Sequence, residues 1–360
     1  MNFKSWPSEI KSKALTWALG LARALGLAEG LGLARAIGLS GALLLAGPAV
    51  SAKESLSQTP SALRALTTLP DLAEIIQTIG GDRVQVQSLL TGHEDPHYVD
   101  ARPDFVAQAS QADLLCSMGL DLEVGWLPRV LSRSGNRSIQ RGGPGFCEAG
   151  RSVRALDVPS GPIDRSMGDL HPHGNPHFNL SPRSMAEASE EVLRVMVGLR
   201  PEWQAEFESR QKDFVQSMAK LEEAVREKLQ VLKTSGAAPL VIEYHQEFTY
   251  FLRLYNIPSL GSIEEKPGVA PSAAHLAQVA KRARENSVRL ALANPSSPRR
   301  TLRRFEQLSG VKVLRLPLSI KPSHPELATI ARLQHHLADQ LILALGTKDS
   351  EQGVQARRDH

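Results

Sequence analysis

Residues 62–90 show apolar positions with the spacing of both strands, about every second residue, and helices, every third or fourth residue. Residues 62–69 are apolar enough for a strand, and residues 70–79 carry an apolar side chain at every third or fourth position, which predicts a helix ending at Gly80-Gly81. Residues 84–90 alternate and predict a second strand, which leads into a loop containing His97. The order is strand, helix, strand and loop.

The same order returns in the next segment. Residues 103–111 have helical spacing, residues 112–117 form a short apolar run typical of a buried strand, and residues 119–131 predict a loop followed by a helix. Residues 133–170 are rich in Gly, Arg, Ser and Pro, which predicts a long loop with a brief strand at 153–158. Strands that alternate with helices favour a parallel α/β sheet.

Residues 182–233 form a long helical region that is interrupted at 198–201. Apolar residues between Phe207 and Leu232 recur three and four positions apart, so that one face of the helix is apolar. A helix lying across a protein of two lobes is the interpretation we favour, and a coiled-coil partner helix is the alternative.

A second series of strands and helices follows the long helix. The pattern predicts these elements: strand 239–244, helix 247–255, a Gly/Pro-rich loop 262–271, helix 272–285, strand 287–293, helix 298–309, strand 311–316 and helix 325–345. Residues 347–360 are polar and charged, and we expect a disordered tail.

Composition and the N-terminal segment predict a soluble protein that is exported from the cytoplasm. With 360 residues, 42% hydrophobic and 22% charged, the chain has the balance of a soluble protein of two domains. The first 52 residues combine a basic start, an apolar run at 36–49 and the small residues Val50-Ser51-Ala52, the pattern of a secretory signal cleaved after Ala52. A spanning helix is the alternative, but the run is shorter than the roughly 20 residues that a span needs. No cysteine follows the run, so a lipid-anchored form is not indicated.

Charge and cysteine content narrow the class of protein further. The net charge of +4 comes mostly from residues 1–52, which leaves a nearly balanced mature chain and argues against a nucleic-acid partner. Cys116 and Cys147 are the only two cysteines. In an exported protein they can form one disulfide, and one buried thiol with one loop thiol is the alternative.

Three histidines lie close to the ends of predicted strands or loops and carry the strongest chemical signal. His97 and His177 each end an Asx-Pro-His tripeptide, and His245 follows the apolar strand at 239–244. The proline stiffens the loop just before the histidine, so that the imidazole is presented at low entropic cost. Neutral imidazole is the commonest protein ligand for zinc and related ions, so the three residues predict one metal site.

The chain has eight further histidines. His93, His171 and His173 precede the main histidines and are interpreted as solvated loop residues that help capture an ion, with accessory or competing ligands as the alternative. The remaining five are interpreted as structural or surface residues: His275, His324, His335, His336 and His360. The sequence His93-Glu-Asp-Pro-His97 has the letters of a His-Glu-x-x-His motif, but its Pro96 disfavours the helix on which a metalloprotease places this motif. The chain has no Gly-x-Ser-x-Gly or phosphate-binding Gly-Lys-Ser/Thr motif, although three histidines alone do not separate a metal binder from a hydrolase.

These residues resemble the solute-binding proteins of zinc and manganese ABC transporters, the ZnuA/TroA type of periplasmic receptor. The similarity runs through nearly the whole mature chain. The segments that carry it are Leu66-Thr-Thr-Leu-Pro-Asp-Leu-Ala, Ile79-Gly-Gly-Asp-Arg-Val, Asp95-Pro-His97, Ala112-Asp-Leu-Leu, Gly119-Leu-Asp-Leu-Glu, Gly174-Asn-Pro-His177-Phe-Asn-Leu-Ser-Pro, Tyr244-His245-Gln-Glu-Phe-Thr-Tyr and Pro267-Gly-Val-Ala-Pro-Ser.

The resemblance implies an α/β fold of two lobes, each with a parallel sheet flanked by helices, joined by one long rigid helix. On this basis the chain divides into a signal peptide (1–52), a first lobe (53–182), a helical region with the linking helix (183–235), a second lobe (236–346) and the tail (347–360). It further implies an ion held in the cleft by His97, His177 and His245. The protein would be a periplasmic receptor, not an enzyme, that hands the ion to a membrane permease; we expect a monomer.

The fourth ligand is where the chain departs from the resemblance. Members of the family commonly add a carboxylate from the second lobe, but the strand ends here carry Asn294-Pro295 and Leu316-Pro317, and the family's usual Asp after the second motif is Ser181. Glu264 in the loop 262–271 is our candidate, with a solvated loop acid or a water in its place as alternatives.

Three imidazoles suit Zn²⁺ better than Mn²⁺, which prefers oxygen ligands, so zinc is the expected ion and manganese the alternative. By the general affinity order copper and nickel would bind as well. Binding should weaken as histidines protonate at low pH. Two other classes stay open. One is a metal-dependent adhesin; the other is an exported zinc hydrolase using Glu243 or Glu247 as its base.

Overall fold

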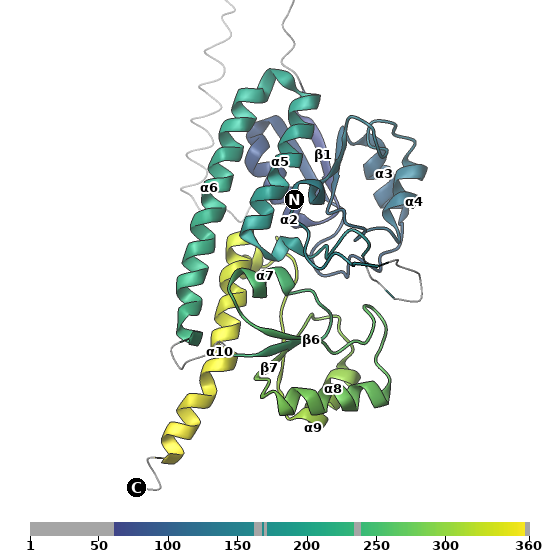
Figure 1. Ribbon diagram of the computed structural model, residues 1–360. Coiled ribbons are helices and arrows are strands. Elements are labelled where there is room, and N and C mark those ends of the chain that lie inside the picture. Colours follow the sequence, from purple (N-terminus) through teal and green to yellow (C-terminus); the bar gives the residue numbers. More distant parts are fainter. Residues whose placement is uncertain (1–60, 162–167, 169–170, 234–238, 357–360) are drawn as a thin grey trace, which may run out of the picture. The chain divides into compact units, whose positions relative to one another are not determined.

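The computed structural model describes residues 61–161, 168, 171–233 and 239–356, except for the side chains of residues 347–356 (Figure 1). Our predictions for residues 1–52, including cleavage after Ala52, lie outside the described residues. Within the described part, no helix combines the length and apolar character that a membrane crossing requires.

The first sheet has four parallel strands in the order β2-β1-β3-β4. α2 begins at Pro70, where the fixed φ of proline suits the first helical turn, and its predicted apolar face is fully buried. The strands and helices of this part are β1 (Leu63–Thr67), α2 (Pro70–Gly80), β2 (Val84–Ser88), α3 (Pro103–Gln111), β3 (Leu114–Ser117), α4 (Leu127–Ser134) and β4 (Phe146–Glu148).

The fourth strand lies where the sequence did not predict one. We expected it at 153–158, but in that segment only Val153 is buried and the backbone forms a loop. The strand is β4, where Phe146 and Cys147 are buried beside β3. Cys147 lies directly opposite Cys116, with 4.3 Å between their Cα atoms, and the two form a disulfide. Neither cysteine is therefore a free thiol, which decides between the two alternatives.

The second sheet repeats the topology of the first, with four parallel strands in the order β6-β5-β7-β8. β6 was not predicted, because its sequence Ser-Leu-Gly-Ser has no apolar alternation and, as an edge strand, it buries little. The elements are β5 (Val241–Glu243), α7 (Thr249–Leu254), β6 (Ser259–Ser262), α8 (Ala273–Glu285), β7 (Leu290–Ala293), α9 (Arg299–Ser309) and β8 (Val313–Arg315).

The strand order reverses at the same place in both sheets. β1 has β2 on one side and β3 on the other, and β5 has β6 and β7. Open α/β sheets bind ligands in the crevice outside the carboxyl ends of the strands at such a point. His97 follows β2 and His245 follows β5, so both lie on loops that leave this end of their sheets.

Two long helices complete the helical region as predicted. α5 (Pro182–Leu199) and α6 (Gln204–Leu229) pack against each other, with the short turn at Pro201–Trp203 between them. α6 buries Phe207, Phe214, Met218 and three further apolar residues at the predicted spacing. Short 3-10 turns are Gly81–Arg83, Ala149–Ser152, Phe178–Leu180, Pro201–Trp203, Gln230–Lys233 and Pro325–Leu327. The fold class is the predicted one of two parallel α/β sheets with a long helix between them in the chain.

α10 (Ile330–Ala356) differs from its prediction in two respects. It continues past Leu345 into the segment that we expected to be disordered, where Lys, Glu, Gln and Ala residues all favour a helix. Its buried residues also join a core cluster that contains residues of both sheets, and the helix contacts α6. Figure 1 shows α10 running alongside α6. The end of the chain therefore connects the second sheet back to the core of the first.

Candidate metal centre

His97, His177 and His245 come together from three distant segments of the chain. Each offers one ring nitrogen, and the three nitrogens all lie within 4.8 Å of one another. Their ring centroids are 5.1 Å apart for His97 and His177, and 5.7 Å apart for each of the other two pairs. The sequence therefore correctly predicted which histidines converge.

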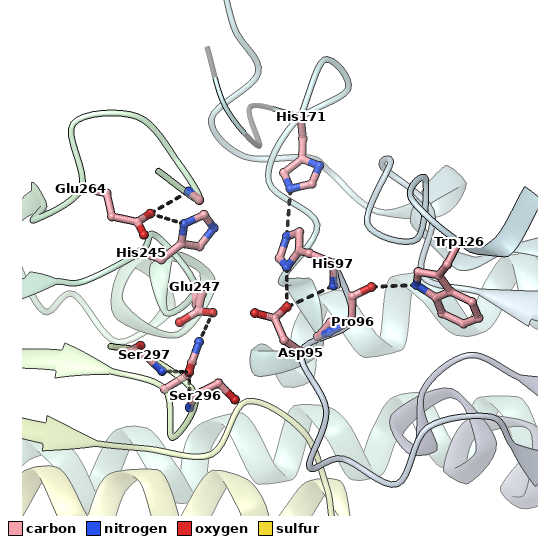
Figure 2. A network of polar contacts seen from close by, with 12 residues as sticks. Asp95, Pro96, His97, Trp126, His171, His245, Glu247, Glu264, Ser296 and Ser297 are labelled. Carbon is pink, nitrogen blue, oxygen red and sulfur yellow. Dashed lines mark hydrogen bonds and ion pairs between the residues drawn. The ribbon is translucent and has the colours of Figure 1, made fainter. Parts of the chain in front are cut away.

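The loop before His97 fixes one of its nitrogens. Oδ1 of Asp95 accepts hydrogen bonds from the backbone N–H of His97 (3.0 Å) and from its Nδ1 (2.9 Å), while Trp126 donates to the carbonyl of Pro96 (2.8 Å) (Figure 2). Burial works to raise the pKa of Asp95, but its hydrogen bond and charge interaction with His97 outweigh burial and lower it. Because Nδ1 bonds to Asp95, Nε2 is the nitrogen of His97 that faces the cluster.

The second tripeptide holds His177 in the same way. Oδ1 of Asn175 accepts from the backbone N–H of His177 (3.0 Å), and Nδ2 of Asn175 donates to the carbonyl of Gln246 (2.7 Å). His177 is buried, and its Nε2 has no hydrogen-bond partner within the described residues. Burial, and then the charges of His97 and His245, lower the pKa of His177 well below its usual value, so it is neutral. A buried nitrogen without a partner calls for an explanation, and a ligand between the three histidines would supply one.

Glu264 lies behind His245 and contacts its far nitrogen. Oε2 of Glu264 is 2.8 Å from Nδ1 of His245 and accepts a second hydrogen bond from the backbone N–H of Gly268 (2.8 Å). Figure 2 shows Glu264 on the side of His245 that faces away from His97. Burial lowers the pKa of His245, but the hydrogen bond to Glu264 and the charges of Glu247 and Glu264 reverse this and raise it to about 9. Glu264, our candidate fourth ligand, is not in the group of converging ligand atoms.

Two further residues, His171 and Glu247, lie close to the three converging histidines. Nε2 of His171 lies 3.2 Å from Nε2 of His97, and burial lowers the pKa of His171 to about 3. Glu247 is only 2% exposed; its Oε1 accepts from Asn294, and its Oε2 has no partner among the described residues. Burial raises the pKa of Glu247 to about 7. His97, His245, Glu247 and Glu264 line one cavity of about 280 Å³.

The other histidines lie apart from the cluster. His173 bonds to Asp121 through Nδ1 (2.6 Å), and His93 packs against His324 with ring centroids 5.2 Å apart. Of the five histidines that we interpreted as structural or surface residues, His360 lies outside the described residues, and the other four do not join the converging group.

Comparisons with known proteins identify the family. Residues 66–343, more than half of the chain, match the family ZnuA, described as zinc-uptake complex component A, periplasmic. The metal ABC transporter substrate-binding lipoprotein SsaB of Streptococcus sanguinis is 23% identical over 212 residues, which are 58% of this chain and 64% of the relative. The manganese ABC transporter substrate-binding lipoprotein ScaA of Streptococcus gordonii is 22% identical over 219 residues, with the same coverage.

Solved structures show the same fold. The periplasmic zinc-binding protein TroA of Treponema pallidum superimposes with a TM-score of 0.63 and 20% identity, over 79% of this chain and 99% of that structure. The match to the curated relatives spans less than two thirds of their length.

Proposed function

The chain belongs to the ZnuA family, described as the periplasmic component A of zinc-uptake complexes, and from this premise we propose that it captures a divalent transition metal and delivers it to the permease of an ABC importer. The observation that supports this best is the convergence of three imidazole nitrogens from both halves of the fold, one of them buried without a partner. The proposal includes a periplasmic location and a monomeric receptor without catalytic activity.

His97, His177 and His245 are the proposed ligands. Carboxylates bond to Nδ1 of His97 and of His245, an arrangement that fixes the ring and leaves Nε2 as the ligating atom. We assign Asp95 and Glu264 this orienting role, so Glu264 is proposed to act through His245 rather than on the ion. Glu264 nevertheless supplies negative charge next to the site.

Zinc is the proposed ion. Imidazole nitrogen suits zinc, whereas manganese prefers oxygen ligands. TroA is named for zinc and ScaA for manganese, so the relatives by themselves allow both ions. Copper and nickel would also bind to imidazoles, and the supply of each metal and the geometry of the site would then select among them.

Calorimetric titration of the chelator-stripped mature chain, beginning at Lys53, tests the proposal. We expect one zinc ion per chain, and the loss of tight binding in each of the variants His97→Ala, His177→Ala and His245→Ala. His324→Ala removes a histidine outside the cluster and should leave the titration unchanged. Stoichiometric zinc binding that survives all three changes would contradict the proposed site.

A further inference from the structure

His171 is placed next to His97 at a distance that suits two ligands of one ion. The two Nε2 atoms are 3.2 Å apart (Figure 2). In a tetrahedral zinc site with Zn–N bonds of 2.0–2.1 Å, two ligating nitrogens are about 3.3 Å apart. The pair His97 and His171 therefore already has the spacing of one edge of such a site.

The two nitrogens are within hydrogen-bond distance of each other, so one of them carries the proton between them. An ion that is bound by both nitrogens needs both lone pairs, and its binding therefore requires this hydrogen bond to break.

We propose that His171 is the fourth protein ligand. Its Nε2 lies 3.2 Å from that of His97 but outside the group formed by the other three nitrogens, so on binding the proton between the two Nε2 atoms is released to water and Nε2 of His171 moves in to join His97, His177 and His245 around the ion. This inference rests on the proposed function. A set of four imidazoles favours zinc over manganese. It also accounts for the neutral residues Asn294 and Leu316 at the strand ends where the family's carboxylate was expected.

Glu247 is the competing ligand. It is buried in the same cavity and its Oε2 is unpartnered. A carboxylate in the fourth position would give an oxygen ligand and a site better suited to manganese. The two assignments therefore differ in both the atoms around the ion and the metal that binds best.

X-ray absorption at the zinc edge and zinc–manganese competition distinguish the two assignments of the fourth ligand. Both are measured on the unchanged chain and on the variants His171→Ala, Glu247→Gln and His173→Ala. We expect four imidazoles in the unchanged chain, three with an added oxygen in His171→Ala, and zinc binding weakened roughly 10- to 100-fold. His173→Ala is the matched control from the same loop. Three imidazoles in the unchanged chain, or a loss of one ligand only in Glu247→Gln, would overturn the proposal. The proposed function would stand in that case, provided that His97→Ala still abolishes zinc binding.

A separate observation concerns charge on the second half of the fold. Residues 273–315 contain ten lysines and arginines but two glutamates, an excess of eight in a chain whose net charge is +4. Arg299, Arg300, Arg303 and Arg304 are exposed at positions of α9 that share one face of the helix. We call these four residues, with the exposed Lys281, Arg282, Arg284 and Lys312, the basic face.

One end of the basic face adjoins the metal cavity, because Pro298, which lines the cavity, directly precedes Arg299 at the start of α9. Arg315 lies beside the basic face and donates to the carbonyls of Pro295 (2.9 Å) and Ser297 (3.1 Å), in a loop that lines the cavity with His245. Burial, and then the charges of Arg299 and Arg303, lower the pKa of Arg315, so these positive charges repel one another. They also repel an arriving cation. Among the described residues, neither Arg299 nor Arg303 forms an ion pair that would offset this cost.

We infer that the basic face docks against an acidic surface on the importer's permease. This also rests on the proposed function. The entrance of a pore for cations is lined with acidic side chains, and guanidinium groups pair with carboxylates in a bidentate way. Docking beside the cavity would bring the ion to such an entrance. Anionic lipid is the alternative partner, but lipid does not require the face to adjoin the cavity.

The double variant Arg299→Glu/Arg303→Glu tests this inference, with Arg129→Glu/Arg133→Glu as the matched control. The control pair is exposed at the same spacing on α4, in the first half of the fold. We expect charge reversal on α9 to reduce binding to permease-containing membranes at least 10-fold, with the calorimetric affinity for zinc unchanged. The control should bind normally. Equal binding to membranes that lack the permease, or to phosphatidylglycerol vesicles, would overturn the inference.

Discussion

At the scale of single residues, the hydrogen bond between Glu264 and Nδ1 of His245 can be separated from direct ligation. Glu264→Ala removes the carboxylate that orients His245, and we expect zinc binding to weaken roughly 10- to 100-fold. Glu264→Gln keeps an acceptor oxygen and should lose less. Calorimetric titration measures both, and the neighbouring Glu265→Gln is the control. A lost oxygen ligand in the absorption spectrum of Glu264→Gln would instead make Glu264 a direct ligand.

The sequence revealed the converging histidines but not the residues that orient them. The two Asx-Pro-His tripeptides can be recognised in the sequence because Asx and Pro restrict the backbone of the residues directly beside them. Whether Glu264 points at the ion or at Nδ1 of His245 depends on side-chain direction across a sheet, which spacing along the chain does not determine. The same holds for the approach of His171 to His97.

At the scale of elements, two carboxylates of α2, one buried and one half-buried, join it to the start of α10 and the segment before it. Asp71 accepts hydrogen bonds from Asn179 (3.1 Å) and from Ser319, and Glu74 accepts from the backbone N–H of Ile330 (2.7 Å). Burial raises the pKa of Asp71 to about 6 although its hydrogen bonds lower it, and burial raises the pKa of Glu74 to about 7. Both groups therefore hold protons more tightly in the folded chain than in the unfolded one.

This difference predicts a pH dependence. The stability that Asp71 contributes is fully present below its unfolded pKa, near 4, and is lost as the pH rises through 6. We expect the free energy of unfolding of the unchanged chain, relative to Asp71→Asn, to fall by up to about 3 kcal/mol between pH 4 and 7. Urea denaturation at several pH values measures it. Exposed Asp82→Asn is the control, and a difference that does not change with pH would contradict the prediction.

The disulfide between β3 and β4 gives a second prediction for an element. It closes a loop of 31 residues, for which chain entropy predicts a stabilisation of about 3–4 kcal/mol. The double variant Cys116→Ala/Cys147→Ala should lower the free energy of unfolding by about 3–4 kcal/mol. The affinity for zinc should not change, because both residues lie in the sheet and do not line the cavity. Denaturation and titration of the double variant measure the two quantities. A large loss of zinc affinity would show that β4 positions the site.

Strands and helices were predicted best where they are long or regularly amphipathic. α3 begins and ends at the predicted residues, and α6 buries the predicted face. β4 and β6 were missed because three or four residues at the edge of a sheet carry too little apolar pattern to stand out. Pairing with a neighbouring strand, which sequence spacing does not reveal, is what makes these segments strands.

At the scale of the whole molecule, the partner of the last helix could not be predicted. The spacing of apolar residues gave α10 a buried face, and we assigned it to the second lobe. Its buried residues lie in a core cluster that contains residues of both sheets, and Gln334 donates to the carbonyl of Leu180 in the first half (2.9 Å). An amphipathic pattern tells which face is buried but not what covers it. The fold class could be predicted because it depends on the order of strands and helices along the chain, and not on which helix packs against which sheet.

A site built from both halves of the fold should couple their stability to the ion. His97 and His177 belong to the part with the first sheet, and His245 to the part with the second. An ion that binds only the folded chain stabilises it by about 2.7 kcal/mol at 100 times its Kd, so zinc should raise the midpoint of thermal unfolding by roughly 5 °C or more. Calorimetric scans with and without zinc measure the shift.

The variant His245→Ala is the decisive comparison for this coupling, because it removes the one proposed ligand from the second half and leaves His97 and His177 in place. If the ion holds the halves together, zinc should stabilise this variant little. The part with the second sheet should then unfold at the same temperature with and without zinc. A full zinc-dependent shift in His245→Ala would mean that the first half binds the ion alone, and that its capture does not involve both sheets.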